Sequence, residues 1–262
     1  MPEAAILVHG AWAGPWVWDR FAPLLEAAGI RTVAVDLRPD PDMGPGEDPG
    51  LPQQLARIEA ALDALGGQAA LIGHSGGGVA ISAAAEAFPE RISRLVYVAG
   101  MMLPSGMGFA DLLAAEDAAA RGMAGIGPHL NWTADGAASV APPEAAMAIF
   151  FNDCPAEVAE TAAHRLTPQP EAGRALAATL TPARFGRVPR LYVIADEDRA
   201  VRPEMQRRMI ELSPGAEVLR LPTGHAPQLS APDLLAEAIL PFLADPGAEP
   251  TPVTQTTMET LK

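Results

Sequence analysis

The chain has 262 residues, which is long enough for one large domain, or one domain with an insertion, and for a sizeable buried core. Its formal net charge is −14, from 18 basic and 32 acidic side chains, which argues against nucleic acid or an anionic membrane as a partner because both require a basic surface. No apolar run approaches the roughly 18 residues of a membrane span and no basic segment precedes the first apolar run, so the sequence predicts a cytoplasmic protein without a secretory signal.

Short apolar runs alternate with amphipathic segments in the first hundred residues. The runs have the length and the β-branched content of buried strands, and the segments between them carry apolar side chains at helical spacing. Strands are predicted at residues 4–9, 32–37, 69–74 and 94–99. Helices are predicted at residues 16–28, 51–65 and 76–88.

The pattern changes after residue 100. Residues 101–185 contain no convincing strand, and their Ala, Met, Gly and Pro content predicts short helices joined by irregular turns. Two further strands are then predicted at residues 190–196 and 217–221, and two helices at residues 203–212 and 233–244. The tail at residues 245–262 is rich in Pro and Thr and is predicted to be disordered.

Strands that alternate with helices predict a mostly parallel sheet with helices on both faces. The nearly continuous apolar character of each strand agrees, because strands of such sheets are buried on both sides. We therefore expect an α/β core formed by residues 1–100 and 186–244, with residues 101–185 inserted as a helical lid. A ligand would bind under this lid, at the carboxyl ends of the strands.

One motif at the end of the third predicted strand suggests a catalytic nucleophile. Gly73-His74-Ser75-Gly76-Gly77 matches the pattern G-x-S-x-G and lies between a predicted strand and a predicted helix, which is the context of a nucleophile elbow. Glycines there let the strand and the helix pack closely while the serine adopts a strained backbone conformation. Ser75 is therefore the predicted nucleophile, and a glycine-rich turn with an idle serine is the alternative.

A serine hydroxyl is a weak nucleophile and needs a general base. Of the five histidines, His225 directly follows the last predicted strand, at the end of the sheet where Ser75 is expected. The base in turn needs a carboxylate that orients it. The loop after the fifth predicted strand offers Asp196 and Asp198, while Glu197 between them equally suits a solvated charge. Either aspartate gives the chain order Ser, Asp, His, and spacing alone leaves the choice open.

Backbone N–H groups are also needed, because they stabilise the oxyanion that forms during acyl transfer. The N–H of Gly76, at the start of the predicted helix, is one candidate donor. The loop after the first strand, His9-Gly10-Ala11, supplies the second candidate at Ala11. The alternative is that His9-Gly10 is only the exit of a strand.

Together these residues resemble the α/β-hydrolase superfamily, and within it the group that contains plant methyl-ester hydrolases, hydroxynitrile lyases and their bacterial relatives. The similarity covers most of residues 4–244 and is carried by the segments LVHGAWAGPWVWDRFAPLLEAAG, LIGHSGGGVAISAAAEAFPERI and GHAPQL. It implies an α/β-hydrolase fold with a mostly parallel sheet, helices on both faces and an inserted helical lid. The residues that it implies are the nucleophile Ser75, the base His225, the acid Asp198 and the oxyanion amides of Ala11 and Gly76.

Two positions depart from the hydroxynitrile lyases of this group. Those lyases carry a Lys after the catalytic His and a Thr before the first oxyanion amide, where this chain has Ala226 and Gly10. Both differences favour hydrolysis of a carboxylic ester, which needs no metal or organic cofactor. The alternative is a lyase, a lactonase or cyclase, or a cofactor-free general-base enzyme on a natural-product intermediate. A ligand-binding protein without turnover is a third hypothesis.

Large apolar side chains near the expected site predict an apolar pocket for a small-molecule ester. For each of them, ordinary packing of the lid on the core is the alternative. The candidates are Trp12, Met102, Trp132, Phe150 and Phe151. Besides the substrate, the sequence allows one further partner, a second copy of the chain in a homodimer.

Overall fold

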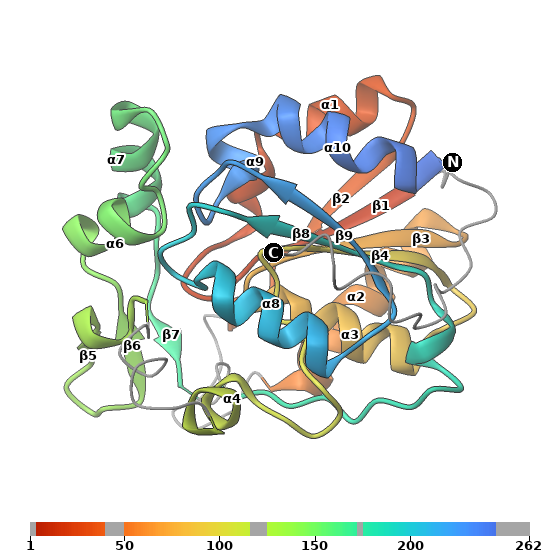
Figure 1. The fold of residues 1–262 in the computed structure, drawn as a ribbon, viewed down its shortest axis with the longest axis horizontal. Coiled ribbons are helices and arrows are strands. Elements are labelled where there is room, and N and C mark those ends of the chain that lie inside the picture. Colours follow the sequence, from red (N-terminus) through yellow and green to blue (C-terminus); the bar gives the residue numbers. More distant parts are fainter. Residues whose placement is uncertain (1–3, 40–49, 116–124, 172–174, 245–262) are drawn as a thin grey trace.

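A computed structural model of the protein describes residues 4–39, 50–115, 125–171 and 175–244. Its centre is a sheet of six strands in the order β2-β1-β3-β4-β8-β9 (Figure 1). Every neighbouring pair in this sheet is parallel. The strands are β1 (Ala4–Val8), β2 (Arg31–Val35), β3 (Ala69–His74), β4 (Ile92–Val98), β8 (Arg190–Ala195) and β9 (Ala216–Leu221). The predicted parallel sheet is thus confirmed.

Helices cover both faces of the sheet (Figure 1). One face carries α1 (Ala22–Ala27), α9 (Pro227–Ser230) and α10 (Pro232–Ala244), and the other carries α2 (Leu51–Leu65), α3 (Gly77–Ala87) and α8 (Pro203–Leu212). Two separate apolar cores result, and neighbouring strand residues divide between them. Leu7 of β1 packs in the core under α1 and α10, whereas Ile6 packs in the core under α2 and α3. This alternation follows from the opposite directions of successive strand side chains.

Part of the segment between β4 and β8 lies beyond the end of the sheet toward which the arrows of β8 and β9 point (Figure 1). In the described part of the segment, the helices are α4 (Phe109–Ala115), α6 (Pro143–Ile149) and α7 (Ala156–His164), with short 3₁₀ turns at Gly127–His129 and Phe185–Arg187. It also contains a small antiparallel sheet of β5 (Asn131–Trp132), β6 (Ala138–Val140) and β7 (Gln169–Pro170). The expectation of no strand in residues 101–185 is therefore wrong, because strands of two or three residues are too short to show an alternating pattern.

The helix expected at residues 16–28 is divided in two. A 3₁₀ turn at Pro15–Trp18 is followed by α1, in which Pro23 occupies the first turn. Proline has no N–H to donate to a carbonyl four residues earlier, so a continuous helix through Pro23 would lose a hydrogen bond. The same residue is well tolerated in a first helical turn.

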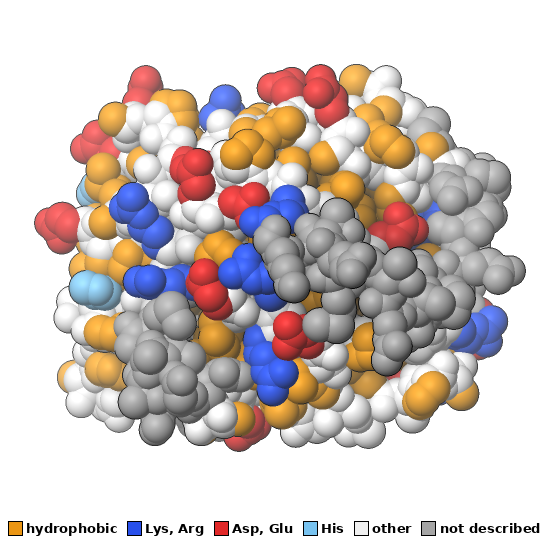
Figure 2. Space-filling view, in the orientation of Figure 1, with side chains coloured by type: hydrophobic (Ala, Val, Ile, Leu, Met, Phe, Trp, Pro, Cys, Tyr) orange, Lys and Arg blue, Asp and Glu red, His pale blue; other side chains and the backbone are white. Residues whose placement is uncertain are grey.

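Charged side chains of both signs lie close together on the face that α8 presents (Figure 2). Arg207 pairs with Glu204 at 3.3 Å and Arg208 with Glu211 at 3.2 Å, each between neighbouring turns of the helix. Exposed pairs of this kind add little stability. Among the residues that the structure describes, no helix combines the length and the apolar character needed to cross a membrane. The tail at residues 245–262 lies outside the described residues, and the division into core and lid stays a prediction.

Adjacent leucines of α10 test the position of the core. Leu235 is fully buried in the core under α1 and α10, whereas 38% of Leu234 is exposed. We expect Leu235→Ala to lower the free energy of unfolding by about 2–5 kcal/mol, because it leaves a cavity. We expect Leu234→Ala to change it by less than about 0.5 kcal/mol. Urea unfolding followed by circular dichroism measures both, and equal losses would contradict this packing.

Candidate active site

Ser75 lies in a tight turn between β3 and α3, as expected for an elbow. Its φ angle of 51° is in the left-handed region that non-glycine residues rarely adopt. The glycines beside it make the turn possible. A Cβ on Gly77 would lie 2.6 Å from the carbonyl oxygen of His9, and one on Gly73 would lie 3.0 Å from the carbonyl oxygen of Gly77. Only glycine lets α3 approach β1 and β3 this closely.

The loop after β1 packs directly against the serine. A Cβ on Gly10 would lie 2.8 Å from Cβ and 3.3 Å from Oγ of Ser75, while the position of a Cβ on Gly76 is 3.6 Å from the amide nitrogen of Ala11. The amides of Ala11 and Gly76 therefore lie near one another beside the serine. Neither has a hydrogen-bond acceptor within the described parts of the chain. Two free N–H groups next to a nucleophile can stabilise an oxyanion.

His225 contacts only one of the two candidate aspartates. Its Nδ1 is 2.8 Å from Oδ2 of Asp198, and both residues are 3% exposed. Asp196 instead accepts hydrogen bonds from the guanidinium of Arg220, with 2.8 Å between Nη2 and Oδ1. The pair that spacing left open is thus separated by geometry: one carboxylate is buried against the imidazole, and the other forms a surface ion pair.

The loop after β8 holds the carboxylate of Asp198 in place. Oδ1 accepts the backbone N–H groups of Ala200 and Val201 at 2.7 and 2.9 Å. Oδ2 accepts an amide N–H of Gln206 on α8 at 3.1 Å, in addition to the imidazole of His225. Three donors thus orient this buried carboxylate, and the imidazole of His225 is the fourth. Because the carboxylate is held in place, its hydrogen bond to Nδ1 restricts rotation of the imidazole.

His74 contacts the main chain of His225 instead of the serine hydroxyl. Its Nε2 donates to the carbonyl oxygen of His225 at 2.8 Å. Burial lowers the pKa of His74 well below its ordinary value, and the nearby His225 adds to this effect. A neutral imidazole that is held this way supports the loop that carries His225.

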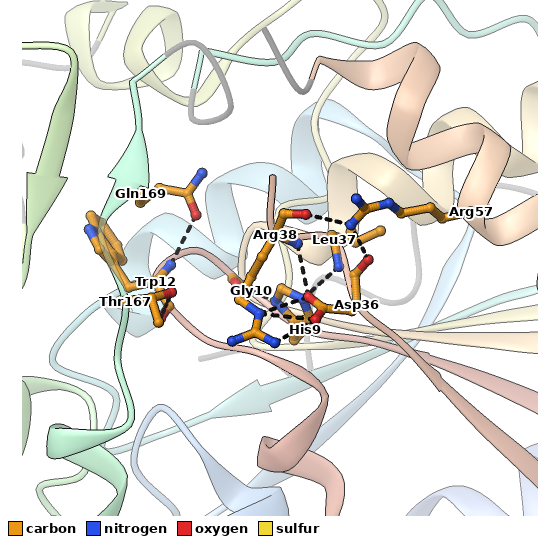
Figure 3. Close-up of polar contacts among 9 residues, drawn as sticks. All are labelled: His9, Gly10, Trp12, Asp36, Leu37, Arg38, Arg57, Thr167 and Gln169. Carbon is orange, nitrogen blue, oxygen red and sulfur yellow. Dashed lines mark hydrogen bonds and ion pairs between the residues drawn. The ribbon is translucent and has the colours of Figure 1, made fainter. Parts of the chain in front are cut away.

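His9 is a site residue whose role the sequence did not reveal. The backbone N–H of Leu37 donates to its Nε2 at 2.9 Å, so its proton is on Nδ1, which donates to the carbonyl oxygen of Gly10 at 2.8 Å (Figure 3). That carbonyl and the N–H of Ala11 belong to one planar peptide group. His9 therefore orients the Ala11 amide. The His9-Gly10 pair was the only sequence signal.

Trp12 is held by residues of the segment between β4 and β8. Its backbone N–H donates to Oε1 of Gln169 at 3.1 Å, and its carbonyl accepts the N–H of Thr167 at 2.8 Å (Figure 3). The indole N–H reaches the backbone oxygen and the hydroxyl of Ser139, both at 3.2 Å. Trp12 consequently attaches the loop that carries Ala11 to β6, to β7 and to Thr167, which lies just before β7.

Ser75 and His225 open onto the same cavity, which has a volume of about 190 Å³. Ala11 and Gly76 line it too. Much of the remaining wall is apolar, with Leu37, Val79, Met101, Phe109, Leu113 and Leu176 among its side chains. Within the described residues, no group of three or more His, Cys, Asp or Glu side chains could hold a metal ion.

A protein-family model described as "Alpha/beta hydrolase family" matches residues 5–238 of the chain. The chain belongs to this family. It is 31% identical to a pyrethroid hydrolase of Sphingobium wenxiniae over 93% of this chain and 88% of that protein. It is 30% identical to a putative chloroplastic methylesterase 11 of Arabidopsis thaliana over 90% of this chain, and spans 62% of that protein's length. The crystal structure of a pyrethroid hydrolase from Sphingobium faniae superposes with a TM-score of 0.82, at 28% identity, over 93% of this chain and 98% of the other.

The cavity of this α/β hydrolase contains some of the predicted pocket residues and excludes others. Trp12 and Phe150 line it, and Phe151 lines a smaller adjoining pocket that also touches Ser75. Met102 does not line it, because its side chain is fully buried in the core and its neighbour Met101 faces the cavity instead. Trp132 is 52% exposed on β5 and also lies outside the lining.

Gly10 offers a test of the packing against Ser75. We expect Gly10→Ala to slow the modification of Ser75 by an organophosphate at least about 100-fold, because the new methyl group displaces the serine or the Ala11 amide. Gly67→Ala is the matched control, since nothing lies within 4 Å of a Cβ there. Mass spectrometry follows the modification. A Gly10→Ala protein that reacts at the wild-type rate would contradict the close approach.

Proposed function

We propose that this α/β hydrolase cleaves carboxylic esters of small, largely apolar molecules through an acyl-enzyme intermediate on Ser75. The observation that carries the proposal is the 2.8 Å contact between Asp198 and Nδ1 of His225, beside a cavity that the imidazole shares with Ser75. With Nδ1 held by the carboxylate, Nε2 of His225 is the nitrogen left to act as the base.

In the first half of the reaction, His225 takes the proton of the Ser75 hydroxyl as Oγ bonds to the ester carbonyl carbon. The carbonyl electron pair moves to oxygen, and the resulting oxyanion accepts hydrogen bonds from the amides of Ala11 and Gly76. The oxyanion then collapses, the bond to the alcohol oxygen breaks, and His225 gives its proton to the leaving alcohol.

In the second half, water enters the cavity and His225 takes one of its protons. The resulting hydroxide attacks the acyl carbon, and the tetrahedral intermediate breaks the bond to Ser75 Oγ. The serine regains a proton from His225 and a carboxylic acid leaves. Each step uses groups of the chain and water alone.

The nature of the cavity supports an ester of modest size. A volume of about 190 Å³ with mainly apolar walls suits a small molecule with few polar groups. The names of similar proteins agree with this, since one is a pyrethroid hydrolase and another a putative methylesterase. Which acyl and alcohol parts are preferred can be measured with p-nitrophenyl and methyl esters of graded size.

Removing the nucleophile tests the mechanism. We expect Ser75→Ala to lower kcat for p-nitrophenyl acetate by about 10⁴–10⁶-fold, because the acyl-enzyme cannot form. Ser93→Ala removes a β4 hydroxyl that has no hydrogen-bond partner among the described residues and does not line the cavity, so it is expected to keep the wild-type rate. Release of p-nitrophenol measures both rates. Full turnover by Ser75→Ala would exclude the acyl-enzyme mechanism.

The two aspartates of the loop after β8 give a matched pair for the acid. We expect Asp198→Asn to lower kcat by about 10⁴-fold, because the amide favours the wrong tautomer of His225. Asp196→Asn removes only the surface pair with Arg220, so we expect a change of less than about twofold. Equal effects of the two substitutions, measured with the same ester, would rule out the assigned role of Asp198.

A further inference from the structure

The wall of the cavity contains a buried polar side chain that the proposed mechanism does not use. Gln54 on α2 is only 9% exposed and lines the cavity together with Ser75 and His225. Within the described residues, its side-chain amide makes no hydrogen bond or other polar contact. By contrast, Gln169 in the same wall accepts the N–H of Trp12.

The position of Gln54 on α2 is one where stability favours an apolar residue. The buried residues of this helix are Gln54, Ile58, Ala61 and Leu62, which form one stripe at helical spacing. Three of these four side chains are apolar and pack against the sheet or α3. A primary amide offers two donors and an acceptor oxygen with two lone pairs, and burying it without partners destabilises the fold. Because the described residues offer this amide no partner, a group inside the cavity can serve as one.

The topology places Gln54 at a distance from the reacting carbonyl. Helix α2 contacts β1 and β2, and Leu37, which follows β2, lines the cavity as well. Ser75 follows β3, and the strand order is β2-β1-β3. Neighbouring strands lie about 4.8 Å apart, so the Gln54 side of the cavity is displaced across the sheet from the nucleophile by one to two strand spacings, about 5–10 Å.

The charges around the cavity restrict the group that Gln54 would bind. The described lining contains no lysine or arginine, and its carboxylate is Glu171. A carboxylate or phosphate on the ligand would lose its hydration here without gaining a cationic partner from the described lining. A neutral oxygen, in contrast, can accept from or donate to the amide of Gln54.

We propose that Gln54 determines specificity by hydrogen-bonding a neutral carbonyl or hydroxyl oxygen that lies remote from the scissile ester. The preferred substrates are then apolar esters that carry such an oxygen several bonds from the reacting carbonyl, instead of plain hydrocarbon esters. This inference rests on the proposed ester hydrolysis.

The test compares two p-nitrophenyl esters that differ in one group, the octanoate and the 7-oxooctanoate, with wild-type protein and Gln54→Met. Methionine keeps the length of the side chain and removes its hydrogen bonds. The measured quantity is kcat/KM for the keto ester divided by kcat/KM for the octanoate. We expect this ratio to fall about 10-fold in Gln54→Met, the size of effect that one buried neutral hydrogen bond produces.

Gln53→Met is the matched control, because Gln53 is the neighbouring residue of the same helix and does not line the cavity. We expect its ratio to equal that of the wild type. An unchanged ratio in Gln54→Met would overturn the inference while leaving ester hydrolysis intact. If the wild-type protein hydrolyses neither of these esters and cleaves no ester of the graded series, the proposed function itself is overturned.

A measurement on the wild-type protein alone keeps the inference testable if Gln54→Met does not fold. For the p-nitrophenyl 5-oxo, 7-oxo and 9-oxo esters, kcat/KM is divided by kcat/KM of the corresponding hydrocarbon ester. Along this series the distance between the keto group and the ester increases. A fixed partner at Gln54 predicts a maximum of the ratio at one position. A ratio that is flat or changes steadily along the series would overturn the inference.

Discussion

The site depends on the close approach of two turns at the carboxyl ends of β1 and β3. A Cβ on Gly10 would lie 2.8 Å from Cβ of Ser75, and one on Gly77 would lie 2.6 Å from the carbonyl oxygen of His9, just after β1. This contact requires the strained backbone of Ser75, and the surrounding core maintains the strain. It also brings the amide of Ala11 beside that of Gly76. A serine, the N–H groups of Ala11 and Gly76 and the end of a helix therefore meet because glycines leave room for them.

The parallel sheet then collects the remaining groups. Asp198 follows β8 and His225 follows β9, two strands that lie side by side, while Ser75 follows β3 on the other side of β4. In a parallel sheet all these loops leave from the same edge, so residues more than a hundred positions apart share one cavity. Three other donors on the Asp198 carboxylate and the contact from His74 to the His225 carbonyl support the position of the imidazole.

The segment between β4 and β8 contributes to the site in two ways. It supplies cavity walls such as Phe109 and Phe150, and it holds the backbone of Trp12 through Thr167 and Gln169. Gln54 of α2 places an amide among the apolar side chains of the same cavity. The cavity thus combines residues at the carboxyl ends of the strands with side chains from helices on separate segments of the chain.

By itself, the sequence determined the alternation of strands and helices, the elbow at Ser75 and the histidine after the last strand, because these rest on local spacing and on glycines with a steric purpose. Local patterns could not separate Asp196 from Asp198, since the two differ only in which one turns inward to meet His225. Nor could they show that Met101 faces the cavity instead of Met102, that residues 131–170 form a small sheet, or that Gln54 is buried beside the site. Those features depend on contacts between segments that are distant in the chain, and only the packed tertiary structure brings such segments together.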